Sequence, residues 1–206
     1  VLLLHSNYFS LGGVDFTNNG NSFFPSFVKA FSEQLCVICV NVFVLISGWF
    51  GIRPTLKGAC SLLFQVFFYH VLIVLVLYCA GLRIDFVSVL KGCYFGSSYW
   101  FVMSYLVLYA LSPILNEFVK SATFKQFISV LVAFFFLEFV YFMVPNSDFL
   151  GGYSSISFIG LYLLAQFLRN HSKVFVRFGM ALNFTLYVVF SLFPILLLFL
   201  INRQGL

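Results

Sequence analysis

The stretch VNVFVLISGWFG, Val40 to Gly51, joins a long apolar run to residues that can hold a ligand. Ser47 and Gly48 have little or no side chain, so a second backbone or a ligand can approach the run closely at that level. Two cations, Arg53 and Lys57, follow just beyond the run. The alternative interpretation is ordinary packing between helices that present small residues, with the cations outside the packed region.

A second group able to do chemistry is His5, at the end of the apolar stretch VLLLH. Imidazole titrates near neutral pH, so a histidine can take a proton from a hydroxyl that acts as a nucleophile. On spacing alone, the simpler interpretation is a histidine that meets water at the end of a helix. The neighbouring Ser6 and Asn7 are candidates for orienting the ring.

Two more titratable residues, His70 and Glu138, lie inside the apolar runs FFYHVLIVL and FFFLEFVYF. A charge in hydrocarbon is costly unless it is paired or neutralised, so both side chains are expected to face a bundle interior or water. We expect them to act as structural polar contacts, with a proton relay as the alternative. Their candidate partners are each other, Gln65, Asn41 and Tyr141.

The composition determines which elements must position these residues. Hydrophobic residues make up 62% of the chain and charged residues 8%, which is too little charge for a soluble surface. The apolar runs are uninterrupted, whereas strands of membrane barrels alternate polar and apolar residues. The sequence therefore predicts an all-α, polytopic transmembrane helix bundle, with residues 1–206 forming a single domain.

About six spanning helices are expected, at about 20 residues per crossing, after a partial N-terminal helix. The predicted runs are Gln34–Phe50, Ser61–Leu82, Tyr99–Leu115, Phe127–Val144, the shorter Ser154–Leu168, and Phe178–Ile201. The first residue is Val1 and apolar runs lie near both ends, so we expect a fragment that is truncated at both termini.

Lysine and arginine fall mainly in alternate connections, which predicts that these connections are cytoplasmic. They hold Arg53 with Lys57, Lys120 with Lys125, and then Arg169, Lys173 and Arg177. The connection from Ser6 to Ser32 is then external. The net charge of +5 forms no basic run, so membrane lipid and not nucleic acid is the expected partner. Cys36 and Cys39 have no second pair nearby, so no metal site is predicted.

The stretch from Tyr99 to Asn116 has aromatic residues at a four-residue spacing, Phe101, Tyr105 and Tyr109. This spacing puts two hydroxyls on one helix face, which can line a groove for a ligand or pack against other helices. Three further residues of the stretch have simple structural interpretations. Trp100 suits a membrane-interface anchor, Pro113 a kink or helix end, and Asn116 a helix cap.

Three blocks of the sequence resemble one known family. They are VLLLHS with its histidine, VNVFVLISGWF, and YWFVMSYLVLYALSPILN, in which Trp, two Tyr, Pro and Asn all match. SFIGLYLLAQFLR is a weaker match, and RPTLK stands where some members carry Arg-x-x-Arg. The family is the membrane-bound acyltransferase family 3, polytopic enzymes that O-acylate cell-envelope polysaccharides and related glycans.

The resemblance implies an O-acyltransferase of a bacterial cytoplasmic (inner) membrane with several membrane passes. Acyl-CoA, chiefly acetyl-CoA, would be the co-substrate and a glycan hydroxyl the acceptor, with no bound cofactor and no metal. His5 would be the catalytic general base. The donor-binding residues would be Ser47, Gly48, Arg53 and Lys57, and the groove-lining residues Trp100, Tyr105, Tyr109 and Asn116.

Two other classes of function remain open on the sequence. One is a multi-pass transporter or glycan flippase, in which His70 and Glu138 would contact substrate or protons. The other is a helical membrane scaffold without chemistry. An arginine about ten residues before His5 would favour the enzyme, whereas inverted repeats of these helices would favour transport.

Overall fold

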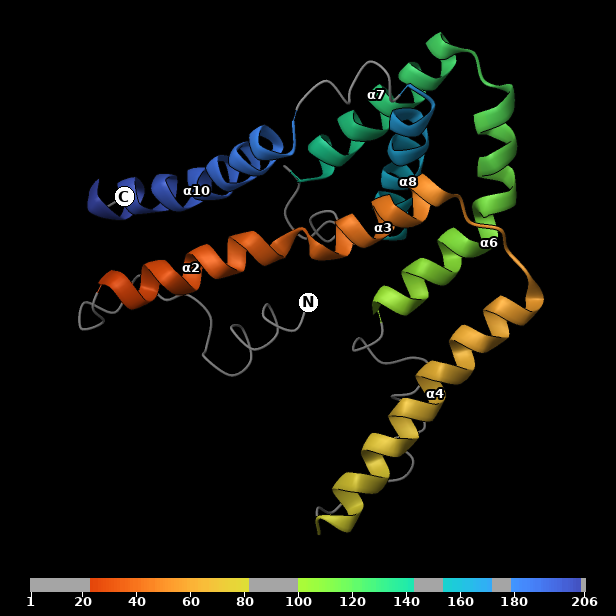
Figure 1. Cartoon of the computed structure of the whole chain (residues 1–206), viewed down its shortest axis with the longest axis horizontal. Helices are drawn as coiled ribbons and strands as arrows, with labels where there is room; N and C mark the ends of the chain where they lie inside the picture. The colour runs from red at the N-terminus through yellow and green to blue at the C-terminus, as the bar shows by residue number, and fades with distance from the viewer. Residues whose placement is uncertain (1–22, 82–99, 143–153, 172–178, 205–206) are drawn as a thin grey trace. The chain divides into compact units, whose positions relative to one another are not determined.

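The computed structural model describes residues 23–81, 100–142, 154–171 and 179–204. These residues are helical almost throughout, and no strand occurs among them (Figure 1). The helices are α2 (Phe23–Val37), α3 (Cys39–Phe50), α4 (Leu56–Cys79), α6 (Trp100–Ser121), α7 (Phe124–Phe142), α8 (Ser155–Asn170) and α10 (Met180–Gln204). The predicted all-helical class is confirmed for this part of the chain. His5 lies outside it.

Each of the six predicted runs contains a helix. The predicted number of spanning helices is not confirmed. Three described segments are long and apolar enough to cross a bilayer, Phe27–Phe50, Leu56–Cys79 and Trp100–Ser121. α8 has only 16 residues, fewer than the ~20 that a crossing needs. In α10 the apolar stretch Ala181–Leu197 is also short. Three such helices are compatible with a membrane protein.

The first of these segments begins earlier than the sequence predicted. The external connection was expected to continue to Ser32, yet α2 is helical from Phe23. Pro25 was interpreted as a loop residue. Proline is nevertheless tolerated in the first turn of a helix, because the backbone N–H groups there have no helical partner. The predicted boundary at Gln34 is therefore wrong.

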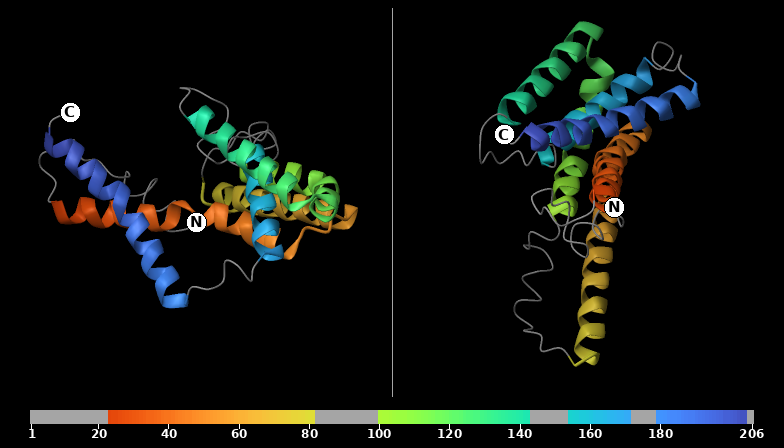
Figure 2. Two further views of the ribbon diagram at one scale, coloured as in Figure 1. Left: turned by 90° about the horizontal axis from the view of Figure 1, so that it is seen from above. Right: turned by 90° about the vertical axis from the view of Figure 1, so that its left-hand side faces the viewer.

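The chain divides into two units, residues 1–43 with 170–206 and residues 44–169. In the first unit, α10 lies across α2 (Figure 2). The Tyr187 hydroxyl donates a hydrogen bond to the Leu35 carbonyl, which lies in the last turn of α2, where helical carbonyls lack donors of their own. The prediction of a single domain over residues 1–206 stays a prediction.

In the second unit, the core forms between α7 and α8. Its buried residues are Phe127, Leu131, Leu163 and Phe167. The rings of Phe127 and Phe167 meet edge to face with centroids 5.3 Å apart, a favoured geometry because a positive ring edge meets a negative ring face. α8 is the helix with the most buried side chains among those described, so it is the element against which its neighbours are positioned.

α6 continues through Pro113 to Ser121, so the alternative that Pro113 ends this helix is wrong. Proline has no N–H and leaves the carbonyl four residues earlier, that of Tyr109, without its helical donor. The buried Ser112 hydroxyl donates to this Tyr109 carbonyl at 2.7 Å. A neighbouring side chain thus satisfies the backbone group that the proline releases, as a helix inside a membrane requires.

Candidate functional site at the turn between α3 and α4

The turn between α3 and α4 follows directly from its residue types. Gly51 has a positive φ of 78°, and its N–H bonds to the Ser47 carbonyl at 3.0 Å, which ends α3 in the left-handed conformation that glycine adopts without strain. Thr55 starts α4, because its side-chain oxygen accepts a bond of 3.0 Å from the Gly58 N–H. The sequence from Gly51 to Thr55 therefore encodes a helix end, a turn and a helix start.

Two side chains of α8 hold the last turn of α3. The buried Gln166 amide donates to the Gly48 carbonyl at 2.7 Å, and the Arg169 guanidinium donates to the Trp49 carbonyl at 2.9 Å. The last carbonyls of a helix have no partner within it, so α8 supplies donors that α3 lacks. The end of α3 is therefore capped by side chains of another helix.

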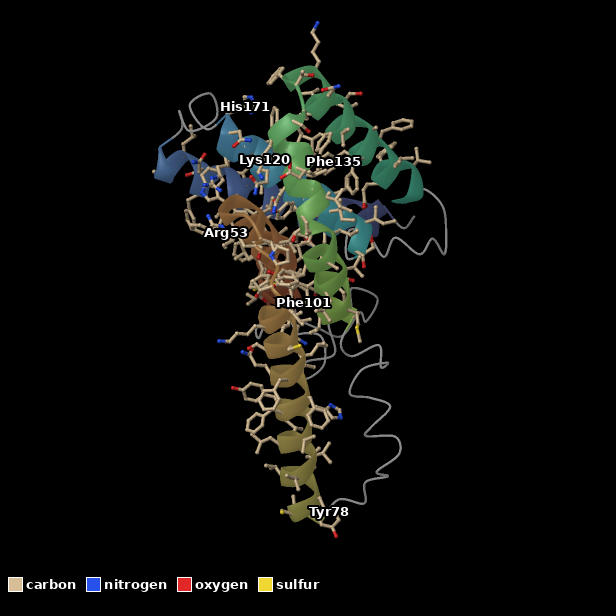
Figure 3. The ribbon with its side chains drawn as sticks, turned by 90° about the vertical axis from the view of Figure 1, so that its right-hand side faces the viewer. Arg53, Tyr78, Phe101, Lys120, Phe135 and His171 are labelled. Carbon is tan, nitrogen blue, oxygen red and sulfur yellow. The ribbon has the colours of Figure 1, made fainter. Side chains whose placement is uncertain are left out.

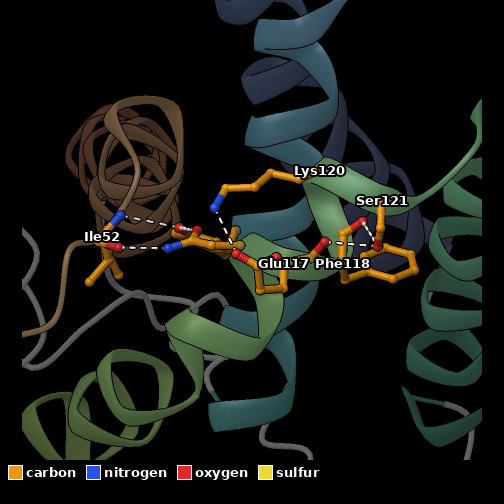
Figure 4. Close-up of polar contacts among 7 residues, drawn as sticks. Ile52, Glu117, Phe118, Lys120 and Ser121 are labelled. Atoms are coloured by element: carbon orange, nitrogen blue, oxygen red, sulfur yellow. Dashed lines mark hydrogen bonds and ion pairs between the residues drawn. The ribbon is translucent and has the colours of Figure 1, made fainter.

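The backbone of Ile52 is held by two side chains that also bond to each other. The Tyr162 hydroxyl accepts from the Ile52 N–H at 3.1 Å and donates to the Asn116 side-chain oxygen at 2.5 Å. The Asn116 amide then donates to the Ile52 carbonyl at 2.9 Å, and Figure 4 draws both bonds at Ile52. We call the bonds among Ile52, Tyr162 and Asn116 the Ile52 ring of hydrogen bonds. This ring connects the turn to both α6 and α8.

Tyr109 of α6 holds the backbone of Thr55 in the same way. Its hydroxyl accepts from the Thr55 N–H at 2.9 Å and donates to the Thr55 carbonyl at 3.2 Å. One turn earlier on α6, the Tyr105 hydroxyl lies 3.4 Å from the Ser47 hydroxyl oxygen. Tyr105, Tyr109 and Asn116 therefore contact the α3–α4 segment.

Gly48 marks the closest approach of α3 to α8. A Cβ atom added to Gly48 would lie 2.8 Å from the Ala165 Cβ and 2.9 Å from the Tyr162 carbonyl oxygen. These distances are shorter than a van der Waals contact, and the carbonyl belongs to backbone that does not yield easily. The sequence allowed either a ligand or a second backbone to lie beside Gly48. In the structure, the backbone of α8 lies there.

Arg53 and Lys57 lie on the outside of this network. Both side chains are exposed, and neither bonds to another residue in the part of the chain that the structure describes. Figure 3 places Arg53 and Lys120 toward one end of the second unit and Tyr78 at the other, and Arg169 joins the basic end through its bond to α3. Lys173 and Arg177 of the third basic connection lie outside the described residues, and the common cytoplasmic side of the three connections stays a prediction.

The remaining predicted residues are not brought to the turn. Trp100 packs at the opposite end of α6, with its ring centroid 6.4 Å from that of Phe158, about 24 Å along the helix from Asn116 at 1.5 Å per residue. Of the groove-lining set, Tyr105, Tyr109 and Asn116 therefore contact the α3–α4 segment, whereas Trp100 lies apart from it. Of the donor-binding set, Ser47, Arg53 and Lys57 lie on or beside the turn, and Gly48 lies beneath it.

The sequence interpretation assigned no role to Tyr162 or Gln166, and it counted Arg169 only among the basic residues of a connection. Their spacing of four and then three residues places them on one face of a helix, and this was the signal that could have found them. SFIGLYLLAQFLR, which contains all three residues, is the weaker match to the family. α8 proves to supply half of the contacts that hold the turn.

Glu138 has a partner that was not predicted. The buried Ser157 hydroxyl donates to the Glu138 carboxylate at 2.6 Å, and the Ser154 hydroxyl lies 2.9 Å from that of Ser157. This fits the expectation that Glu138 faces other helices and makes structural polar contacts. His70 lies half-buried on α4, and the relay alternative stays a prediction.

A hollow lies along α7, away from the turn. It has a volume of about 540 Å³ and is lined by Phe124, Lys125, Ile128, Ser129, Val132, Ala133 and Phe136. None of these residues belongs to the predicted site. Among the described residues, no group of three or more His, Cys, Asp or Glu could hold a metal ion.

Replacing Tyr162 with phenylalanine is expected to weaken the Ile52 ring of hydrogen bonds. The change leaves the Ile52 N–H and the Asn116 oxygen without the hydroxyl, and an unsatisfied buried group costs about 1–3 kcal/mol. The expected result is a melting temperature in detergent lower by roughly 2–10 °C. Tyr78→Phe, which removes an exposed hydroxyl, is the control, and an equal fall in both variants would contradict this role for Tyr162.

The geometry therefore consists of a turn with two exposed cations, Arg53 and Lys57, held by side chains of α6 and α8. No family model, no curated protein and no solved structure matches this chain.

Proposed function

We propose that this protein is an integral membrane O-acyltransferase, which transfers an acyl group, chiefly acetyl, from acyl-CoA to a hydroxyl of a cell-envelope polysaccharide or related glycan. One observation carries the proposal. The blocks around Ser47, Tyr109 and Tyr162 resemble the same acyltransferase family, and the contacts between these blocks hold the one turn that presents Arg53 and Lys57. Segments far apart in the sequence thus meet where the family resemblance expects the donor.

In this proposal, the α3–α4 turn binds the phosphorylated end of acyl-CoA from the cytosol. Arg53 and Lys57 pair with its phosphates, and phosphates prefer such cations because charge-assisted hydrogen bonds are strong. Gly48 acts indirectly, by letting α8 approach closely enough to fix the turn. Because the backbone of the turn is already held, it loses less conformational entropy on binding, which favours affinity for the donor.

In the chemical step, the acceptor hydroxyl attacks the thioester carbonyl while His5 takes the hydroxyl proton. The tetrahedral intermediate then collapses, the carbon–sulfur bond breaks, and CoA leaves as a thiolate that receives the proton from the histidinium. The products are the O-acylated sugar and free CoA. We place the enzyme in a bacterial cytoplasmic membrane with several membrane passes.

Removing the charges of Arg53 and Lys57 together is expected to raise the dissociation constant for acetyl-CoA by about tenfold or more, since each hydrogen bond to a charged group contributes ~1.5–3 kcal/mol. Added salt should narrow the difference between wild type and Arg53→Ala/Lys57→Ala, because ions screen the phosphate contacts. The effect on kcat should be smaller, since these contacts act on the ground state and transition state alike. The measurement is acetyl-CoA binding by the purified protein over a range of salt.

Lys120→Ala/Lys125→Ala is the matched control, because it removes the same charge from exposed residues of the same end. Equal weakening in both double variants would show a general charge effect and remove Arg53 and Lys57 from the site. If the wild type binds no acyl-CoA at all, the result favours the transporter or flippase over the enzyme.

A further inference from the structure

α4 has two different faces. No side chain of its 24 residues is fully buried, yet one side is partly covered, by residues that include Leu63, Phe67 and His70. On the opposite side, residues that follow one another at spacings of three and four along the helix are exposed. We call this side the outer face of α4, and it consists of Ser61, Phe64, Gln65, Phe68, Tyr69 and Leu72.

Gln65 makes the outer face unsuitable for lipid alone. It lies nine residues after Leu56, which is about 14 Å along the helix and near the middle of a hydrocarbon layer about 30 Å thick. Its side chain is exposed and bonds to no other residue in the described part of the chain. An amide without a hydrogen-bond partner is costly in hydrocarbon, so a polar group at the same depth must meet it.

A second copy of this chain supplies such a group. Two copies inserted in the same orientation place their Gln65 side chains at the same depth, and a carboxamide both donates and accepts hydrogen bonds. The outer face carries no charged residue, so two identical faces meet without repulsion. A two-fold axis along the membrane normal then brings each Gln65 opposite its counterpart.

The aromatic residues of the outer face are arranged for such packing. The rings of Phe64 and Phe68 stack with centroids 6.1 Å apart, and Tyr69 meets Phe68 edge to face at 5.6 Å. Side chains that already pack against one another lose little freedom when a partner binds. We propose that the outer face of α4 is a dimer interface between two copies of this chain, with Gln65 hydrogen-bonded to Gln65 across the two-fold axis.

Disulfide cross-linking in native membranes tests this interface. In a full chain without its natural cysteines, Phe68→Cys and Phe64→Cys place a thiol on the outer face. Phe67→Cys and Leu63→Cys are the matched controls on the partly covered face. Oxidation of either outer-face variant should give a cross-linked species of twice the chain mass, in an amount roughly tenfold above that of the controls. When two differently tagged copies are expressed together, both tags should be found in this species.

The role of Gln65 is tested on the Phe68→Cys background. Gln65→Leu should lower the cross-linked fraction by about three- to tenfold, the range of measured hydrogen bonds between membrane helices, whereas Gln65→Asn should retain most of it. Equal cross-linking on both faces, an adduct whose mass differs from two chains, or no effect of Gln65→Leu would each overturn the proposal. The total amount of membrane-inserted protein is measured in every variant, so that loss of folding is not read as loss of the dimer.

Discussion

Replacing His5 with alanine is expected to lower O-acylation of the envelope glycan by about a hundredfold or more, the scale of a lost general base. Without the imidazole, the acceptor hydroxyl must attack the thioester while it still holds its proton. A hydroxyl in this form is a much weaker nucleophile than one whose proton a base removes. Expression and membrane insertion should stay near those of the wild type, because His5 stands at the end of an apolar stretch and not within it. The measurement is acyl content of the purified glycan from cells that carry each variant.

His171→Ala is the control, since it removes an imidazole with no proposed role in the reaction. Near-normal acylation by His5→Ala would remove His5 from the mechanism. If acetyl-CoA binding also disappeared in this variant, the defect would lie in folding or donor binding, and a role as general base would not be supported.

Replacing Gly48 with leucine is expected to lower the melting temperature by at least about 5 °C and to abolish acylation. Even the first atom of a side chain would lie 2.9 Å from the Tyr162 carbonyl oxygen, and the longer leucine must push α8 away from α3. Overpacking of this kind costs ~1–3 kcal/mol or more. The same movement breaks the bond from Gln166 to the Gly48 carbonyl and strains the Ile52 ring of hydrogen bonds.

Ala110→Leu is the matched control for Gly48→Leu, because it adds a similar side chain at an exposed position inside α6. It should leave the melting temperature nearly unchanged. A Gly48→Leu protein that melts normally but binds no acyl-CoA would instead indicate that a ligand uses the space beside Gly48. Normal melting together with normal acylation would contradict both roles of this glycine.

The helices of this protein were predictable from its sequence, and three described segments are compatible with the predicted membrane environment. A run such as Leu56–Cys79 holds so few polar groups that its backbone must bond within itself, and in an apolar solvent a helix achieves this within one segment. The end of α3 and the start of α4 were also local, since a glycine and a threonine suffice to stop one helix and cap the next. The sequence did not separate membrane-spanning helices from shorter ones. α8 was predicted to span the membrane from its apolar composition, but it has only 16 residues and many of them are buried against other helices.

Only the tertiary structure decided what the polar residues of those helices do. The Ile52 N–H and the Tyr162 hydroxyl are 110 residues apart in the chain, and helical periodicity states which residues share a face but not which other helix that face meets. In the sequence, Tyr109 therefore fitted either a ligand groove or packing between helices, and Asn116 either a site or a helix cap. The structure directs their hydrogen bonds to backbone groups of the α3–α4 turn, because buried N–H and C=O groups outside a helix must find partners and these side chains are the ones that the packing of α6 and α8 brings within reach.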